Sequence, residues 1–338
     1  MMVLALLCGF GGGNFSSSMA NISFFYPKAE KGTALGLNAG LGNLGVSAVQ
    51  FVVPLVITAG VFGALGDEAQ TWVKGDVTKQ MWLQNAGFVW VPFIIIATIA
   101  AWFGMNDLAS AKASFKDQAI IFSRKHNWIM CILYLGTFGS FIGFAAGFPL
   151  LTKSQFPEID PVKYAFLGPL VGALVRPLGG WVSDKIKSGA LITQLVFAGM
   201  IVAVIGVISF LPSDGQGGNF WGFFACFIAL FALTGLGNGS TFMQVPVIFL
   251  NMHQKFAQQG LVSEEQARLD ATKEGAAVIG FTAAFAAYGG FFIPKSYGTS
   301  IDLTGSVNAA LIGFILFYVL CLALNWWYYA RKNAEAKC

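Results

Sequence analysis

The chain has 338 residues, of which 56% are hydrophobic and 11% are charged. Soluble globular domains carry about 25% charged residues, so this composition excludes an ordinary water-soluble domain and predicts a membrane protein. The formal net charge of +4 reflects how basic residues divide between the two faces of a membrane. It does not predict binding to nucleic acid.

Nine stretches of the chain are long and apolar enough to cross a bilayer, which needs about 20 mostly apolar residues. Eight of them contain no Asp, Glu, Lys or Arg, and the ninth is interrupted once, by Arg176. They lack the polar stripe of helices that cover a soluble core. We therefore expect an all-α membrane protein with about nine transmembrane helices, over residues 1–27, 32–66, 80–106, 126–152, 164–183, 188–213, 215–254, 275–294 and 303–330.

Three of these stretches precede a charged segment and six follow it. This predicts a partial N-terminal bundle over residues 1–106, a cytoplasmic connector over 107–126 and a six-helix C-terminal bundle over 127–338. If the spans alternate in direction, fourteen of the twenty Lys and Arg residues fall on the connector's side of the membrane. Basic loops stay in the cytoplasm, so we expect a multi-pass protein of the bacterial inner membrane, embedded in lipid, with a cytoplasmic C-terminus.

Arg176 is the one basic residue inside a predicted span. An arginine at the centre of a membrane helix costs about 2.5–3.5 kcal/mol on insertion scales, so we expect it to face a cavity and a partner. All sixteen acidic residues fall outside the predicted spans, and no protein carboxylate is expected at its depth. Its planar guanidinium matches a flat oxyanion through two parallel hydrogen bonds. An anion site is therefore favoured over a structural arginine.

The distribution of titratable residues also bears on energy coupling and on chemistry. Proton-coupled carriers commonly use intramembrane Asp, Glu or His, whereas His126 and His253 both lie near the ends of predicted spans. Exchange of one anion for another is therefore favoured over proton symport. The sequence has no HExxH string, no clustered cysteines and no nucleophile–base pair, so we expect neither an enzyme nor a cofactor or metal.

The turn after the span that holds Arg176 reads GGWVSDKIKSG, residues 179–189. Gly179 and Gly180 permit close approach of two helices. Asp184, beside Lys185, lies at a helix end, where it can bind a helix terminus or a basic neighbour in one conformational state. The string resembles the loop motif that major facilitator transporters carry between the second and third helices of each half. By that count the first span is helix 4 of twelve, which implies a native product or a cut form that lacks about three N-terminal helices.

Two glycine-rich stretches, GLNAGLGNLGVS at residues 36–47 and GLGNGSTFM at 235–243, permit close helix packing in a membrane. Both resemble the paired nitrate-signature motifs of the nitrate/nitrite porter family of the major facilitator superfamily. The strings NFSSSMANISFFYPK, YLGTFGSFIGFAAGF, AAWFGMNDLA and GGFFIPK are similar to NarK-type bacterial nitrate/nitrite antiporters. The resemblance covers essentially the whole chain and implies transport of nitrate and nitrite by alternating access.

In that family an anion is held between two arginines, one from each half, and packed by aromatic rings. The first-half arginine belongs to a helix outside this sequence, so the resemblance implies that this form alone is transport-deficient. A carrier for another small anion and an accessory membrane subunit remain the alternatives, and a monomer is expected. The residues that match the family's substrate contacts are Arg176 as the second-half arginine, the rings Phe15 and Phe138, the hydroxyl of Tyr134, Asn43, and the motif glycines Gly40 and Gly237.

Overall fold

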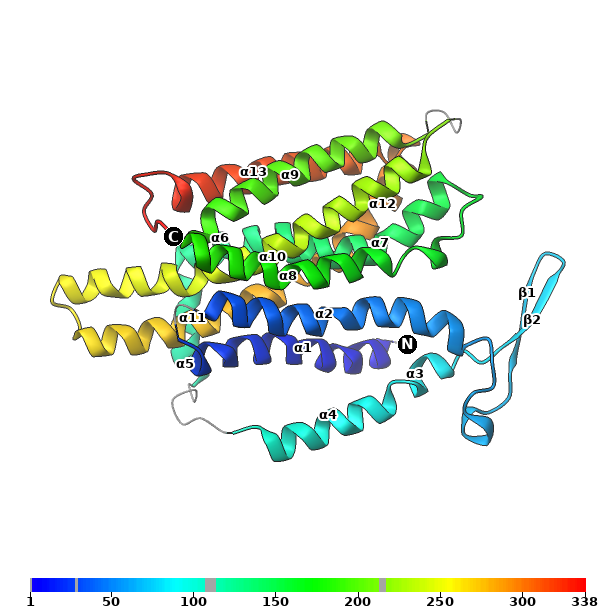
Figure 1. Cartoon of the computed structure of the whole chain (residues 1–338), viewed down its shortest axis with the longest axis horizontal. Helices are drawn as coiled ribbons and strands as arrows, with labels where there is room; N and C mark the ends of the chain where they lie inside the picture. The colour runs from blue at the N-terminus through cyan, green and yellow to red at the C-terminus, as the bar shows by residue number, and fades with distance from the viewer. Residues whose placement is uncertain (1, 28–29, 107–113, 213–216) are drawn as a thin grey trace.

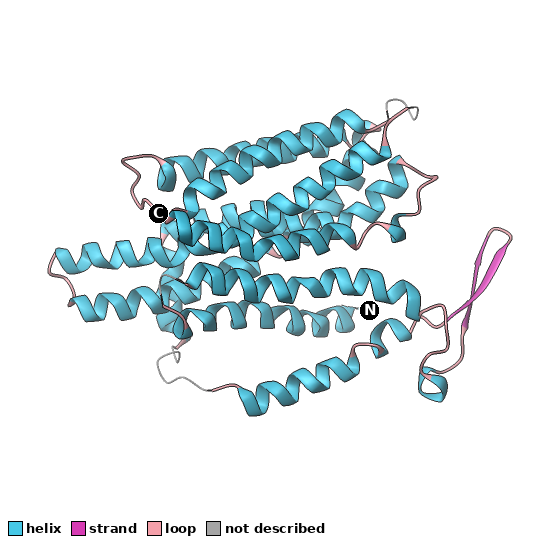
Figure 2. Ribbon diagram, in the orientation of Figure 1, coloured by secondary structure: helices cyan, strands magenta, loops and turns pink. Residues whose placement is uncertain are grey.

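Long helices that lie side by side make up most of the protein (Figures 1 and 2). The structure is a computed structural model, and it describes residues 2–27, 30–106, 114–212 and 217–338. In chain order the elements are α1 (Met2–Phe25), α2 (Lys31–Val56), β1 (Gln70–Lys74), β2 (Val77–Met81), α3 (Asn85–Phe88), α4 (Val91–Gly104), α5 (Phe115–Gln118), α6 (Lys125–Tyr134), α7 (Ser140–Gln155), α8 (Leu167–Ile186), α9 (Gly189–Phe210), α10 (Phe220–Gln258), α11 (Glu264–Ala286), α12 (Gly289–Thr304) and α13 (Asn308–Asn325).

Each of the nine predicted spans coincides with a helix or with a pair of helices that follow one another. Within the described residues, eight segments are long and apolar enough to cross a membrane. The remaining predicted span, residues 1–27, corresponds to α1, which has 24 residues and is not among the eight. Three spans combine two helices each: α3 and α4 form Asn85–Gly104, α6 and α7 form Lys125–Gln155, and α11 and α12 form Glu264–Thr304. The predicted all-α membrane bundle is confirmed.

Helix α4 shows why this bundle belongs in lipid. It has 14 residues, none of them buried, and it lies apart from the other helices in Figure 1. Its exposed side chains include Phe93, Trp102 and Phe103, which are 64%, 82% and 83% exposed. A helix satisfies its own backbone hydrogen bonds, so an almost entirely apolar surface of this kind is stable in hydrocarbon.

The predicted connector is described only in part, and the loop between α2 and α3 contains an element that the sequence does not predict. Residues 107–113 of the predicted connector lie outside the described part of the chain. The remainder begins with α5 and continues as a 3₁₀ turn, Ala119–Ser123. The segment between α2 and α3 forms an antiparallel hairpin, in which Gln70 pairs with Met81. Hydropathy does not reveal this hairpin because its strands lie in an exposed loop, where no buried face imposes an alternating pattern.

Helix α8 packs against α2 on one side and α10 on another, and glycines make both contacts close. Pro177 has no N–H, so the carbonyl of Ala173 lacks its usual partner one turn later in the helix. Gly40 of α2 lies against this carbonyl, and a Cβ built on Gly40 would be 2.8 Å from the Ala173 oxygen. On α10, a Cβ on Gly235 or Gly239 would collide with the α8 backbone. The two glycine-rich stretches therefore hold α8 between two neighbouring helices.

The Gly40→Ala substitution should destabilise the α2–α8 contact. The added methyl group must push the Ala173 carbonyl and the Pro177 ring away, and overpacking of this kind costs about 1–3 kcal/mol. Gly42→Ala is the matched control, because a Cβ there meets no atom within 4 Å. Thermal unfolding in detergent should show a lower midpoint for Gly40→Ala and an unchanged or higher one for Gly42→Ala. Equal midpoints for the two variants would contradict the close packing.

Candidate functional site

The side chain of Arg176 lies fully buried in the middle of α8, with 0% of its surface exposed. Its Nη2 donates a hydrogen bond to the hydroxyl oxygen of Tyr134 at 2.6 Å. Its Nε and Nη1 atoms have no hydrogen-bond partner. Among the side chains that the structure describes, no carboxylate forms an ion pair with it. The guanidinium is therefore a buried charge without a counterion of its own, an arrangement that costs several kcal/mol unless a partner is supplied.

Aromatic rings surround this guanidinium and form what we call the aromatic cage: Phe15 of α1, Tyr134 and Phe138 of the α6–α7 span, and Phe242 of α10. The Cζ atom of Arg176 lies 5.7 Å from the ring centroid of Phe15, 5.3 Å from that of Phe138 and 5.5 Å from that of Phe242. Each such cation–π contact contributes about 0.5–2 kcal/mol. The rings therefore offset part of the cost of burial, but they supply no acceptor for the free N–H groups.

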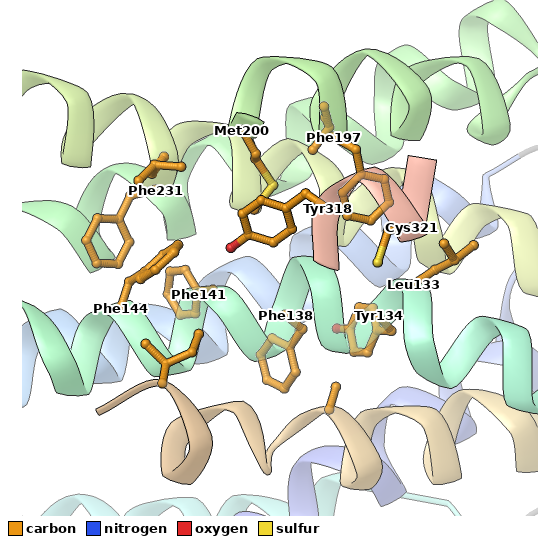
Figure 3. Packing of buried hydrophobic residues seen from close by; sticks show 14 of the residues in the cluster. Leu133, Tyr134, Phe138, Phe141, Phe144, Phe197, Met200, Phe231, Tyr318 and Cys321 are labelled. Carbon is orange, nitrogen blue, oxygen red and sulfur yellow. The ribbon is translucent and has the colours of Figure 1, made fainter. Parts of the chain in front are cut away.

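The rings of the cage stack on one another in a column. Phe15 stacks on Phe138 with centroids 5.1 Å apart and planes within 12°. Tyr134 stacks on Phe138 at 5.1 Å and on Phe242 at 4.2 Å. Figure 3 shows Tyr134, Phe138 and Phe141 following one another along the same span. The column fixes the ring planes beside the guanidinium without any polar contact between the rings.

A π-helical turn, Leu135–Gly139, separates α6 from α7 and carries Phe138. Such turns are rare, and inside α-helices they are found frequently at functional sites. Two glycines of this turn make room for neighbours: a Cβ on Gly136 would press on the Phe197 ring, and a Cβ on Gly139 on the Ala286 carbonyl. The local sequence LGTFG thus permits the wider turn that places Tyr134 and Phe138 together beside Arg176.

The other predicted substrate contacts are Asn43, Gly40 and Gly237, and each has its own surroundings. Asn43 of α2 is buried, with 7% of its surface exposed, and its Nδ2 atom has no partner. Gly40 packs on the α8 backbone, and Gly237 packs against the side chains of Thr137 and Val196. The structure therefore brings Arg176, Tyr134, Phe138 and Phe15 together, and it places the two glycines in helix–helix contacts. A direct role for Asn43, Gly40 and Gly237 in substrate binding stays a prediction.

Asp184 and Lys185 of the loop motif lie in the last turn of α8, whereas Gly179 and Gly180 follow Arg176 by about one turn. Gly179 packs against the backbone of Leu236, and Gly180 faces Gly239 through its backbone nitrogen. The Asp184 carboxylate accepts two hydrogen bonds of 2.8 Å, from the backbone N–H and from the hydroxyl of Thr33. Thr33 lies in the first turn of α2, where N–H groups lack helical partners and a negative charge is stabilising.

Three further residues, on α10 and α11, were not among the candidate site residues of the sequence analysis. Phe242 completes the cage, and it lies within the glycine-rich stretch 235–243, so an aromatic residue in that motif was the available signal. Asn238, in the same stretch, is fully buried with both amide atoms unpartnered. Gly280 of α11 lies beside α1, where a Cβ would be 3.5 Å from the Ser16 carbonyl. Gly280 lies among small and apolar residues, a pattern that does not indicate a site.

The bundle of long membrane helices around the buried, unneutralised arginine has the fold of the major facilitator transporters. The fold is similar to the crystal structure of FucP, a transporter of that superfamily in the outward conformation. The TM-score is 0.54 at 12% sequence identity, over 92% of this chain and 71% of FucP. This likeness concerns the fold alone.

Sequence comparison narrows the class to a family. The chain is 48% identical over 337 residues to the nitrate/nitrite transporter NarU of Escherichia coli, which covers 99% of this chain and 72% of NarU. It is 40% identical over 343 residues to the probable nitrate/nitrite antiporter NarK2 of Thermus thermophilus, covering 100% of this chain and 72% of that protein. No family model matches the sequence. The chain belongs to the NarK/NarU family of nitrate/nitrite transporters.

Removing the Asp184 carboxylate should loosen the contact between α2 and α8. Loss of a cap of this type costs about 0.5–2 kcal/mol, so Asp184→Ala should lower the unfolding midpoint in detergent. A double-mutant cycle with Thr33→Val tests whether the two side chains act together. We expect the combined loss to be smaller than the sum of the single losses, because Thr33→Val removes one of the two bonds that Asp184 accepts. Additive losses would contradict the contact.

Proposed function

We propose that the chain binds nitrate and nitrite at Arg176, in the manner of an anion exchanger that works by alternating access in the bacterial inner membrane; the transport deficiency expected of this form alone stays a prediction. The observation that carries this proposal is the buried guanidinium with free Nε and Nη1 atoms and no carboxylate partner among the described side chains. The names of the relatives, a nitrate/nitrite transporter and a probable nitrate/nitrite antiporter, supply the substrate.

The chemistry of the cage fits a small planar oxyanion. A guanidinium has five N–H donors in one plane, and Tyr134 accepts only one of them. The remaining donors leave a free edge of the guanidinium that can make two parallel bonds to nitrate or nitrite oxygens. The rings of Phe15, Phe138 and Phe242 lie beside the guanidinium. Because the rings of the column contact one another, the anion would bind beside the column at the free edge of the guanidinium, where a small flat ion needs less room than a bulky organic anion.

The distribution of acids supports exchange over proton coupling. Among the described acidic residues, Glu274 is buried, and it forms its contacts with basic side chains at one end of the bundle. Glu274 accepts two hydrogen bonds of 2.9 Å from Arg124 and lies 3.2 Å from His253. Arg176 has only a tyrosine hydroxyl as its described polar partner. When the substrate anion neutralises the central charge, the carrier changes conformation more readily with the anion bound than without it. Exchange of one anion for another requires this preference.

We further propose that the end of the bundle that carries Arg124 faces the cytoplasm. Basic side chains lie close together there, and two of them donate hydrogen bonds to the C-terminal segment. Lys125 donates to the Glu335 carboxylate at 2.5 Å, and Lys255 donates to the Glu335 backbone carbonyl at 2.9 Å. The hydrogen bond to Glu274 raises the pKa of Arg124, so this side chain stays charged. A stable positive charge at one end supports a cytoplasmic C-terminus under the positive-inside rule.

The Arg176→Gln substitution should abolish or strongly weaken anion binding. Each hydrogen bond to a charged group contributes about 1.5–3 kcal/mol, so the loss of two should weaken nitrate binding by at least about two orders of magnitude. Nitrate-induced thermal stabilisation of the purified protein measures this directly. Arg268→Gln, an exposed position on α11, is the matched control and should bind as the unmodified protein does. Equal nitrate stabilisation of both variants would refute the proposed site.

The Tyr134→Phe substitution should weaken nitrate binding moderately and leave the fold intact. The ring stays in the stacked column, and only the hydroxyl that orients Arg176 is lost, at a cost of about 0.5–1.5 kcal/mol. We therefore expect an increase in the nitrate dissociation constant of between twofold and roughly tenfold. Tyr288→Phe, with 61% of the side chain exposed, is the control. A Tyr134→Phe protein with unchanged nitrate affinity would show that the hydrogen bond does not position the guanidinium for binding.

A further inference from the structure

Asn238 is a fully buried amide in the middle of α10, with 0% of its surface exposed. Neither its Nδ2 atom nor its Oδ1 atom has a hydrogen-bond partner among the described residues. A buried amide loses its hydrogen bonds to water, and an amide that stays unpaired destabilises the folded protein. Because nearly all buried polar groups in proteins are paired, each exception needs a physical explanation.

Two other buried hydroxyls on the same part of α10 are paired within the chain. The Thr234 hydroxyl donates to the Phe231 carbonyl at 2.9 Å. The Ser240 hydroxyl lies 2.8 Å from the Thr193 hydroxyl on α9. Hydrogen bonds within and between helices therefore account for these two side chains, but they do not account for Asn238.

The sequence neighbours of Asn238 show where its side chain lies. The residue before it, Gly237, faces the π-helical turn, since a Cβ on Gly237 would be 2.6 Å from the methyl group of Thr137. The residue after it, Gly239, faces α8, since a Cβ there would be 2.5 Å from the Arg176 carbonyl oxygen. Successive side chains of a helix are about 100° apart, so Asn238 projects between these two directions.

Asn238 also shares a face of α10 with Phe242, because residues four positions apart lie on the same side of a helix. The Phe242 ring centroid lies 5.5 Å from the Cζ atom of Arg176 and 4.2 Å from the ring centroid of Tyr134. The amide therefore projects from α10 on the side of the aromatic cage. The Arg176 side chain in that cage carries its own unpaired donors, Nε and Nη1.

We propose that Asn238 is a second polar contact of the anion that binds at Arg176, an inference that rests on the proposed function. Its Nδ2 atom donates a hydrogen bond to an anion oxygen, and its Oδ1 atom accepts one from a free N–H of the guanidinium. Both amide atoms are then paired, and the remaining guanidinium donors bind the anion. An amide suits this position because it offers a donor and an acceptor and carries no charge. A carboxylate there would instead neutralise Arg176 in place of the anion.

The Asn238→Asp substitution tests this placement, because the two side chains have nearly the same shape and differ in charge. The new carboxylate should pair with Arg176, so the unfolding midpoint without nitrate should rise. Nitrate affinity should fall by at least about two orders of magnitude, since the anion loses a donor and meets a negative charge. The matched control is Asn85→Asp, at a fully buried amide of α3 that donates to the Val56 and Ala59 carbonyls. That variant should have a lower midpoint and an unchanged nitrate dissociation constant.

The Asn238→Ala substitution separates a substrate contact from a packing role. Loss of one hydrogen bond to a charged group should raise the nitrate dissociation constant about tenfold or more. The midpoint without nitrate should stay nearly the same, because removal of an unpaired amide offsets the loss of packing. Thr234→Ala, one turn earlier on α10, is the control and should keep the nitrate affinity of the unmodified protein.

Nitrate titrations of the Arg176→Gln variant distinguish this inference from the proposed function. If Arg176→Gln loses nitrate binding while both Asn238 variants bind as the unmodified protein does, the Arg176 site stands and Asn238 is not part of it. If Asn238→Ala lowers the midpoint without changing the affinity, the amide has a packing role and the inference is overturned. If Arg176→Gln binds nitrate normally, the proposed function fails, and the inference that rests on it fails too.

Discussion

The structure depends on how it accommodates a permanent positive charge in the interior of a membrane bundle. Arg176 cannot lose its proton at physiological pH, and no described carboxylate lies beside it. The protein instead surrounds the guanidinium with ring faces and gives it a single hydroxyl acceptor. This arrangement tolerates the charge without neutralising it. A site of this kind gains most from a small anion that brings the missing negative charge and can leave again.

The position of that charge is set by backbone packing. The Arg176 carbonyl is approached from both sides by glycines: a Cβ on Gly36 of α2 would lie 3.2 Å from it, and a Cβ on Gly239 of α10 would also press on it. The α8 backbone at residue 176 is thus wedged between two neighbouring helices. The glycine-rich stretches thus set the position of the guanidinium, because a shift of α2 or α10 would also move α8, the helix that carries it.

Two further contacts couple this central region to the end of the bundle. Asp184 joins the end of α8 to the first turn of α2, the same pair of helices that meets at Gly40 and Ala173. Glu274 joins α11 to Arg124, just before α6. Both contacts place a carboxylate against donors from another segment of the chain. Alternating access requires helices to part at one end of the site and close at the other, and contacts of this type can be broken without unfolding a helix.

The sequence by itself determined where the chain crosses the membrane and which residue carries the unusual charge. The preference of a stretch for the membrane depends on its own residues and not on which other segments pack against it. The charge-free stretches and the isolated Arg176 could therefore be identified from the order of residues alone. The resemblance in the motifs added Phe15, Tyr134 and Phe138, which the structure brings together around that arginine.

Only the tertiary structure decided the rest. The π-helical turn at Leu135–Gly139, the place of Phe242 in the cage and the helix contacts of Gly40 and Gly237 all depend on how helices are rotated against one another. Apolar residues cover most of both the packed and the exposed sides of these helices, so hydropathy does not reveal which face meets which neighbour. That choice is made by the close fit of glycines, prolines and rings between helices.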